Sequence, residues 1–171
     1  AIPNKEIKNL FIKKIREWFR DKSANDGKRL EEFCNAFLEK NTEKIEQLFG
    51  EYLWNTISIR DTAVAKEKKE NFYHGILLGL LGYKANWLIK SNAESGTGYS
   101  DILVEVPNNR TGIVIELKYA GNGDLDAACA EALKQMEEKS YVDKLKQDGM
   151  RNFIKYGIAC FKKDCRVVIA G

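Results

Sequence analysis

Two acidic side chains stand among apolar residues in neighbouring segments of this sequence. Asp101 begins the run Asp-Ile-Leu-Val, and Glu116 lies within Ile-Val-Ile-Glu-Leu-Lys, two residues before Lys118. A charge in a buried strand costs free energy to desolvate unless it has a partner or a chemical task. Two carboxylates and a lysine at one sheet edge can hold a divalent cation and a water beside a phosphate. The set therefore predicts hydrolysis of phosphodiester bonds.

The spacing of these residues predicts that they share one face of a β-hairpin. Alternate residues of a strand point to opposite faces, so Glu116 and Lys118 point one way and the apolar residues between and before them point the other. Asp101 opens the preceding strand, and a turn signal at Pro107-Asn108-Asn109-Arg110 separates the two strands. Paired strands lie roughly 5 Å apart, so we expect the two carboxylates to share one cation.

The ligand types favour a hard cation, Mg²⁺ or Mn²⁺. Mg²⁺ prefers oxygen ligands and is held by one or two carboxylates together with phosphate and water. The backbone carbonyl of Leu117 could complete this set. Lys118 is expected to orient or activate the attacking water, or to neutralise the phosphate. Glu-x-Lys alone is a weak signal, because such a pair more often forms a salt bridge on a solvated strand.

Hydrophobic periodicity and turn signals predict the helices and strands that carry these residues. We expect helices over residues 4–21, 28–39, 41–53, 62–82 and 125–147, and strands over residues 85–90, 99–106, 111–119, 152–161 and 165–170. The order after the helical front end is α-β-β-β-α-β-β, and the first three strands, which are joined by short links, should form a meander. We expect two parts, an N-terminal helical segment over 1–60 and a core over 61–171.

Composition restricts the alternatives. The chain has 171 residues, 44% hydrophobic and 31% charged, with a net charge of +3, which is too small to argue for a polyanionic partner by itself. Four scattered cysteines without a C-x-x-C pair, and a single histidine, argue against zinc and for reduced thiols. No signal peptide and no run of about 20 apolar residues is present, so we expect a cytoplasmic protein without a membrane span.

These segments resemble the PD-(D/E)XK nuclease superfamily. More narrowly, the chain is similar to the nuclease-like domain found C-terminal to AAA-type ATPase domains in bacteria and archaea. The similarity is carried by Glu70 to Gly75, Ser91 to Asp101, Ile113 to Lys118, Ala132 to Gln135 with Tyr141, and Tyr156 to Phe161. Ser100 replaces the proline that usually precedes the aspartate in the superfamily, but this position supplies no metal ligand.

The resemblance implies a fold, a site and a partner domain. The fold would be a restriction-endonuclease-like αβββαβ core of the α/β class, a mixed sheet flanked by helices. Asp101 and Glu116 would bind the metal and Lys118 would be the catalytic lysine, with DNA preferred to RNA as the substrate by the habit of the superfamily. The Ile2-Pro3-Asn4 start, which lacks an initiator Met, resembles the junction after an ATPase domain in a longer parent chain.

Flanking helices offer supporting residues. Glu70 and His74 are one helical turn apart, and a glutamate of this helix joins the metal in some related nucleases, whereas a histidine here more often packs in the core. Gln135 and Tyr141 are expected on one long helix, where related enzymes use such residues to support the site or to contact nucleic acid. For both residues a plain structural role, in the core or in solvent, stays open.

Two other functions stay open at this point. The chain could be a catalytically silent nucleic-acid-binding or regulatory module of a larger ATPase-containing protein, or an interaction domain that docks through the front helices between Ile7 and Leu53. The sequence leaves open whether the chain is a monomer or a homodimer. It also leaves open the form of the substrate, the sequence preference, and endonuclease against exonuclease action.

Overall fold

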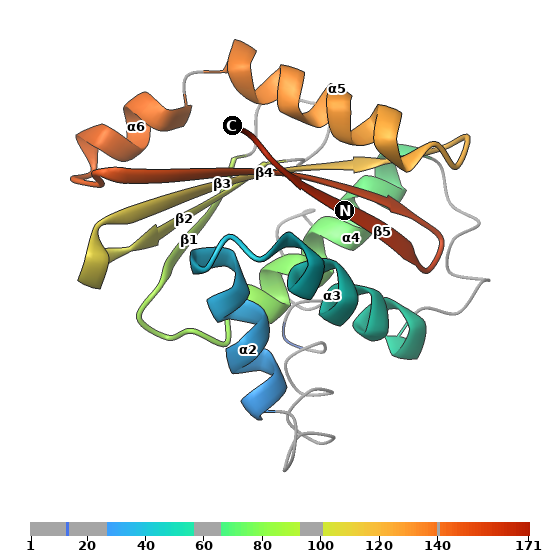
Figure 1. The fold of residues 1–171 in the computed structure, drawn as a ribbon, viewed down its shortest axis with the longest axis horizontal. Coiled ribbons are helices and arrows are strands. Elements are labelled where there is room, and N and C mark those ends of the chain that lie inside the picture. The colour runs from blue at the N-terminus through green and yellow to red at the C-terminus, as the bar shows by residue number, and fades with distance from the viewer. Residues whose placement is uncertain (1–12, 14–26, 57–65, 93–100, 140) are drawn as a thin grey trace, which may run out of the picture.

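A five-stranded mixed sheet lies between two layers of helices (Figure 1). The computed structural model of the chain describes Lys13 and residues 27–56, 66–92, 101–139 and 141–171. Helices α5 (Leu125–Glu138) and α6 (Tyr141–Gln147) cover one face of the sheet. Helices α2 (Gly27–Leu38), α3 (Thr42–Thr56) and α4 (Lys66–Leu81) cover the other (Figure 1). The helix expected over 4–21 falls, apart from Lys13, outside the described residues. The α/β class and the restriction-endonuclease-like core expected from the sequence are confirmed.

The sheet has the strand order β1-β2-β3-β4-β5. Strands β1, β2 and β3 form the expected antiparallel meander, β3 and β4 are parallel, and β5 returns antiparallel to β4. Parallel neighbours need a crossover connection, which the segment with α5 and α6 provides. The strands are β1 (Leu88–Asn92), β2 (Asp101–Val106), β3 (Thr111–Tyr119), β4 (Asn152–Phe161) and β5 (Asp164–Ile169).

The first strand begins three residues later than the expected residue 85. The backbone N–H of Trp87 bonds to the carbonyl of Lys84 at 3.1 Å, so residues 84–87 form a turn and not a strand. Pairing with β2 then runs from Leu88 opposite Glu105 to Asn92 opposite Asp101. The turn after β2 is also tight: residues 107–109 form a 3-10 helix, and Arg110 adopts a left-handed backbone with φ of 52°.

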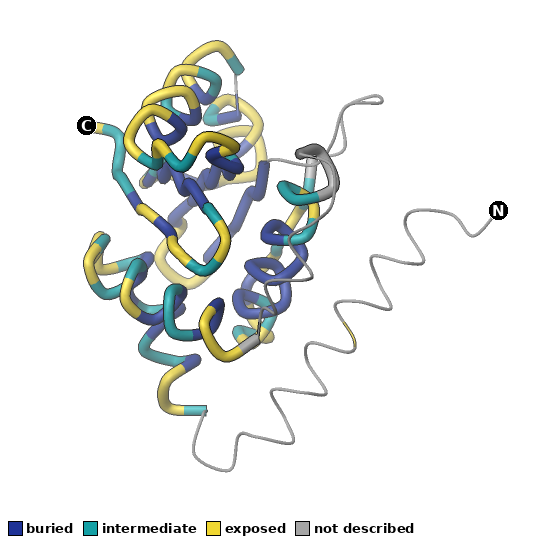
Figure 2. Tube along the Cα trace, turned by 90° about the vertical axis from the view of Figure 1, so that its right-hand side faces the viewer, coloured by how far each residue is buried: buried dark blue, intermediate teal, exposed yellow. Residues whose placement is uncertain are grey.

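The larger hydrophobic core lies between the sheet and the helices α2 (Gly27–Leu38), α3 (Thr42–Thr56) and α4 (Lys66–Leu81). Asn41 caps α3, because its side-chain oxygen accepts the N–H of Lys44 at 3.0 Å. Buried residues concentrate in the sheet and on the helix faces turned toward it (Figure 2). Helices α2 and α3 therefore share one core with the strands.

The expected long helix over 125–147 is wrong, because the chain breaks there into α5 (Leu125–Glu138) and α6 (Tyr141–Gln147). Asp124 caps α5 by accepting the N–H of Ala127 at 3.0 Å. Lys139 ends it with an extended backbone, φ −109° and ψ 128°. The segment contains neither Gly nor Pro, the usual causes of a helix break. The break therefore lacks both of these signals, and Ser140 directly before Tyr141, with Asp143 three residues on, is the residue pattern in the sequence that is typical of a helix start.

Helix α6 packs directly on the sheet through Leu145. Its side chain is buried with Leu103, Val114 and Tyr141 in a second, smaller core. A Cβ at Gly112 would lie only 2.8 Å from the Leu145 Cδ1 atom, so the glycine allows this close approach.

All four cysteines are buried and reduced, as expected from the sequence. Burial raises the pKa of Cys34 and Cys165 to about 12 and that of Cys129 to about 11, and it also raises the pKa of Cys160. Thiols with such pKa values stay protonated at neutral pH and are poor nucleophiles and poor metal ligands. They act as small core residues.

Candidate active site

Asp101 and Glu116 face each other directly across the β2–β3 pair. Both side chains point to the face covered by α5 and α6, because their neighbours Leu103 and Val114 pack there. Residues opposed in an antiparallel pair have Cβ atoms roughly 5 Å apart. Both residues are buried, with relative exposures of 3% for Asp101 and 0% for Glu116. The register thus brings the two acids together as the sequence predicts.

Two ionised carboxylates at this separation repel each other. At an effective dielectric constant of about 20, unit charges roughly 5 Å apart interact by about 3 kcal/mol. Burial adds a desolvation cost to each charge. The arrangement is favourable only if positive charge is placed close by, whether from side chains or from a bound cation.

Asp101 receives two donors from the break between α5 and α6. The Tyr141 hydroxyl donates to the Asp101 Oδ2 atom, and the Lys139 ammonium lies 3.2 Å from the same oxygen. Tyr141 is buried, whereas the side chain of Lys139 is 33% exposed. Lys139 and Tyr141 reach the same oxygen because the helix is interrupted between them.

Lys118 lies on the same face as Glu116, and its Nζ atom is 3.9 Å from the Glu116 Oε1 atom. The pair is mostly buried, with side-chain exposures of 12% for Lys118 and 0% for Glu116. The two residues predicted from Glu-x-Lys therefore lie together. At 3.9 Å the contact is at the long limit of an ion pair, so the ammonium is not bound tightly to this one oxygen.

The carbonyl of Leu117 points toward the β2 side of strand β3. The N–H of Tyr119 bonds to Glu70 at 3.2 Å, while the N–H of Ala120 bonds to Cys160 of β4 at 2.9 Å. Successive residues of a strand direct their backbone groups to alternate sides, so Leu117 shares the direction of Tyr119, away from β4. This is the side on which Asp101 begins its strand.

The α4 residues approach the site from the opposite face of the sheet. Glu70 accepts the Tyr119 N–H through its Oε1 atom, so this oxygen supports the end of β3. His74 is buried, and its Nε2 atom lies 3.4 Å from both the Asp101 carbonyl and the Ser91 hydroxyl. His74 thus contacts the backbone of a candidate ligand.

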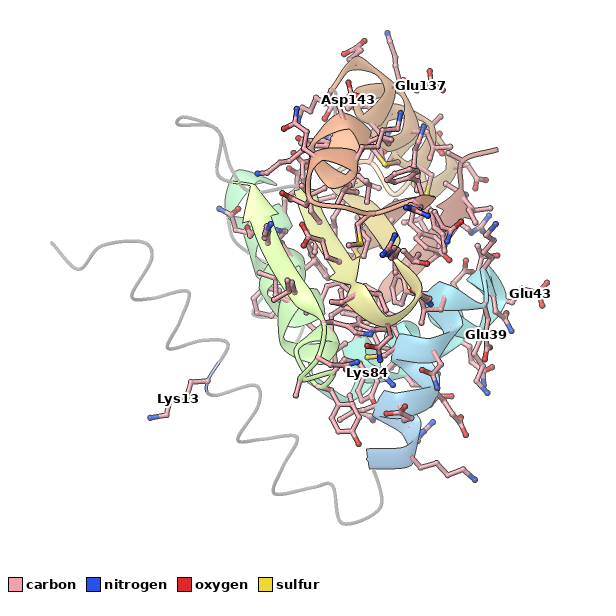
Figure 3. All side chains as sticks on the ribbon, turned by 90° about the vertical axis from the view of Figure 1, so that its left-hand side faces the viewer. Lys13, Glu39, Glu43, Lys84, Glu137 and Asp143 are labelled. Carbon is pink, nitrogen blue, oxygen red and sulfur yellow. The ribbon has the colours of Figure 1, made fainter. Side chains whose placement is uncertain are left out.

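On the other face, Gln135 is half-buried on α5 and Tyr141 begins α6. They do not share one helix, contrary to the expectation. Sequence reasoning missed Lys139, which resembles the other surface lysines of a charged helical stretch. Neighbouring Glu137 and Asp143 point away from the sheet at the outer surface of the α5/α6 layer (Figure 3). Lys139 differs from these surface residues because the helix ends at its position. Hydrophobic periodicity does not predict that end.

The donor set is small for a metal centre. Within the described part of the chain, no three His, Cys, Asp or Glu side chains are grouped to hold a metal ion. Mg²⁺ nevertheless keeps several waters and needs only one or two carboxylates from the protein. Two opposed, buried carboxylates with a backbone carbonyl on the same side fit this requirement.

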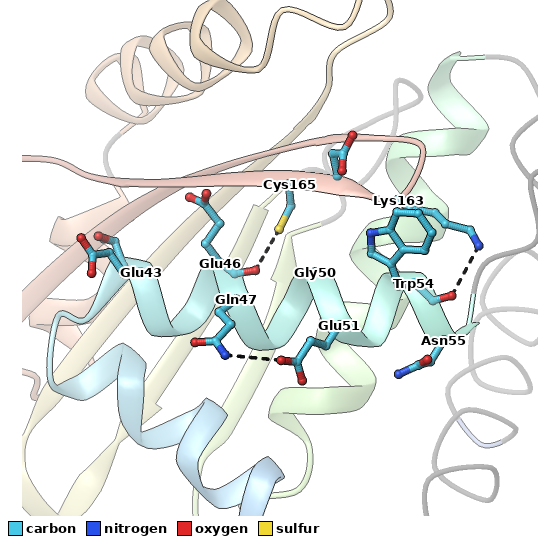
Figure 4. Close-up of a pocket in the computed structure, with 11 residues that line it drawn as sticks. Glu43, Glu46, Gln47, Gly50, Glu51, Trp54, Asn55, Lys163 and Cys165 are labelled. Atoms are coloured by element: carbon cyan, nitrogen blue, oxygen red, sulfur yellow. Dashed lines mark hydrogen bonds between the residues drawn. The ribbon is translucent and has the colours of Figure 1, made fainter.

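A separate groove lies on the other side of the molecule, between α3 and the β4–β5 turn (Figure 4). Its volume is about 640 Å³, and its lining includes Glu43, Glu46, Trp54 and Lys163. The Lys163 ammonium lies 4.8 Å from the centre of the exposed Trp54 ring. None of the predicted site residues lines this groove, so its size says nothing about the carboxylate pair.

Comparison with known proteins supports the interpretation at the level of the family. The model of the PD-(D/E)XK nuclease superfamily matches residues 68–169, a range that contains the carboxylate pair, Lys118 and the helix break. No curated protein and no solved structure matches the chain. None of the described helices is both long and apolar enough to span a bilayer. With the match covering more than half of its length, the chain belongs to the PD-(D/E)XK nuclease superfamily, which indicates a nuclease-type function.

Proposed function

We propose that the protein is a metal-dependent nuclease that hydrolyses phosphodiester bonds of nucleic acid, with DNA as the substrate. The observation that carries this proposal is the direct opposition of two buried carboxylates, Asp101 and Glu116, beside Lys118. A structural role would rarely place two like charges opposite each other in a sheet, because the pair is destabilising until a cation is present.

The roles of the residues follow from their chemistry. Asp101, Glu116 and the Leu117 carbonyl would hold Mg²⁺ or Mn²⁺, which lowers the pKa of bound water and stabilises charge on the phosphate. Lys118 would orient the attacking water or neutralise the phosphate. Tyr141 orients the Asp101 carboxylate through its hydroxyl, and Glu70 supports the strand that carries Glu116 and Lys118.

We also propose a role for Gln135, a location in the cell and a partner domain. Gln135, half-buried on α5, would support the site or contact the nucleic acid. The chain would function in the cytoplasm, C-terminal to an ATPase domain, as a monomer or homodimer. Residues 1–60 would form a helical unit that accompanies the nuclease core of residues 61–171.

Cleavage assays test the proposal. Plasmid and single-stranded, double-stranded and branched oligonucleotides of DNA and RNA are incubated with the protein and Mg²⁺ or Mn²⁺. We expect cleavage that stops with EDTA and falls about 100-fold or more in Asp101→Asn, Glu116→Gln and Lys118→Met. Circular dichroism verifies folding of each variant. Equal cleavage by wild type and all three variants would reject the proposal.

A catalytically silent nucleic-acid-binding module is the second candidate. The observation that favours it is the ion pair of Lys139 with Asp101, because an ammonium group compensates this carboxylate without a metal. The two candidates differ in one measurement. A silent module binds oligonucleotides with the same affinity whether or not Mn²⁺ is present and leaves them intact.

A further inference from the structure

Lys139 lies where a cation would be expected at the carboxylate pair. Its ammonium is 3.2 Å from Asp101 Oδ2, and the side chain of Asp101 is only 5% exposed. The Tyr141 hydroxyl donates to the same oxygen, but a hydroxyl is neutral, whereas Lys139 brings a positive charge. With Lys118 near Glu116, each acid of the pair has its own lysine.

We propose that Lys139 acts as an internal counter-cation that competes with the divalent metal for Asp101. This inference rests on the proposed function, since it concerns the same metal centre. An ammonium and a divalent cation close to one carboxylate repel each other, and a lysine is a compact charge on a flexible stem. Metal binding therefore requires Lys139 to move away from Asp101, and Lys139 weakens the affinity for the metal.

The surroundings of Lys139 permit this movement. Its side chain is one-third exposed, so the ammonium can reach water without a change in the core. Its backbone caps the C-terminal end of α5 in an extended conformation, and its carbonyl accepts the N–H of Tyr141 at 2.9 Å. Tyr141, by contrast, is buried and begins α6, so its hydroxyl can keep the Asp101 carboxylate oriented while Lys139 leaves.

We do not expect Lys118 to exchange with the metal in the same way. Its side chain is 12% exposed, against 33% for Lys139, and it lies 3.9 Å from its carboxylate oxygen, against 3.2 Å. Lys118 is thus more enclosed and held less closely to one oxygen. The exchangeable counter-cation is the lysine at the helix break, and the lysine on the strand stays in the site.

The test measures metal affinity directly and does not depend on cleavage. Isothermal titration calorimetry with Mn²⁺ compares wild type with Lys139→Met, Lys139→Arg and Lys134→Met. Lys134 is an exposed lysine of the same helix and serves as the matched control. We expect Lys139→Met to bind Mn²⁺ about 5- to 20-fold more tightly than wild type, because its competitor is lost. Lys139→Arg, which keeps the charge, and Lys134→Met should stay within about twofold.

A second readout separates competition from damage to the fold. Thermal unfolding without metal should occur at a lower temperature in Lys139→Met, because the carboxylate pair loses a counter-charge, and Mn²⁺ should raise its midpoint by more than in wild type. Mn²⁺ binding to Lys139→Met that equals or is weaker than binding to wild type overturns the inference and leaves the metal centre intact. Absence of Mn²⁺ binding to every protein overturns the metal centre itself, and with it the competition.

Discussion

Strand β2 carries a buried carboxylate at each end of one face, and the two ends are built differently. Asp101 lies opposite another acid, Glu116, whereas Glu105 lies opposite Gly112 on one side and Leu88 on the other. Glu105 is 4% exposed, about as buried as Asp101 at 3%. Burial alone therefore does not distinguish the two carboxylates.

Helix α6 lies between the two ends. Tyr141, its first residue, donates to Asp101, and Asp148, just beyond its last residue, lies 3.1 Å from the Lys90 ammonium. Lys90 also donates to Glu105 at 2.9 Å. At the Glu105 end a lysine joins two acids that come from different elements, and this network ties α6 to the sheet.

The comparison shows which buried acid requires a functional explanation. Glu105 contributes to the structure by linking β2, β1 and the end of α6 through Lys90. The Asp101 end places two acids in direct opposition, which repel and are favourable only with added positive charge. We therefore assign the chemistry to the Asp101 end, and the following predictions test this assignment.

The largest expected difference between the Asp101 end and the Glu105 end of β2 is in the rate of cleavage. Glu116→Gln should reduce metal-dependent cleavage by about 100-fold or more, because a metal ligand is lost, while Glu105→Gln should retain cleavage within about threefold. Initial rates on a linear DNA substrate with Mn²⁺ measure both. A comparable loss in the two variants would mean that the two ends do not differ in function.

The free energy of unfolding should depend more on Glu105 than on Glu116, which is the reverse of the order expected for cleavage. Glu105→Gln should lower the free energy of unfolding by about 1–3 kcal/mol, because it leaves Lys90 and Asp148 with a weakened network. Without metal, Glu116→Gln should leave the free energy of unfolding unchanged or raise it by about 1 kcal/mol, because a like-charge repulsion is removed. Urea denaturation in EDTA measures both values. The comparison fails if Glu116→Gln is the more destabilising variant.

The packing of α6 on the sheet should affect both the stability of the protein and the rate of cleavage. Gly112→Ala places a Cβ 2.8 Å from Leu145 Cδ1, so the helix or its leucine must shift. We expect a loss of about 1 kcal/mol in unfolding free energy and a several-fold loss of cleavage, because α6 carries Tyr141. Gly121→Ala, where no atom lies within 4 Å of the added Cβ, is the control and should change neither measurement.

The smallest predicted effect is the dependence of stability on pH at the Glu105 end. A hydrogen bond with Glu105, and then one with Lys90, lowers the pKa of Asp148 below its usual 3.8. A depressed pKa stabilises the fold above the unfolded value, and this contribution is lost as the pH falls through the folded value. Urea midpoints between about pH 5 and pH 2 should therefore fall less steeply in Asp148→Asn than in wild type.

Lys90 provides the reciprocal measurement. Hydrogen bonds with Glu105 and then Asp148 raise its pKa above 10.5. Its stabilising contribution is complete below 10.5 and is lost as the pH rises through the folded value. Lys90→Met should flatten the alkaline side of the stability profile. An unchanged slope in both variants would show that this network does not titrate with folding.

The fold class, the meander and the carboxylate pair could be predicted from the sequence. Strict alternation in β3 set Glu116 and Lys118 on one face, and the short turn after Val106 left little freedom in the register that brings Asp101 opposite Glu116. Asn41 and Asp124 belong to the residue types that favour helix starts, and both cap helices here, because their short side chains bond to the backbone nearby.

The residues that surround the carboxylate pair could not be predicted, because they come from helices that pack on the sheet. The break after Glu138 has no Gly or Pro signal, and beyond it α6 packs Leu145 on Gly112 of the sheet. That break brings Lys139 and Tyr141 to Asp101, and the packing of α6 on the sheet brings Asp148 to Lys90. These contacts join residues distant in the chain, whereas periodicity reports only on neighbours within one element. The sequence thus located the two acids, and the packing of the helices decided which lysine meets each of them.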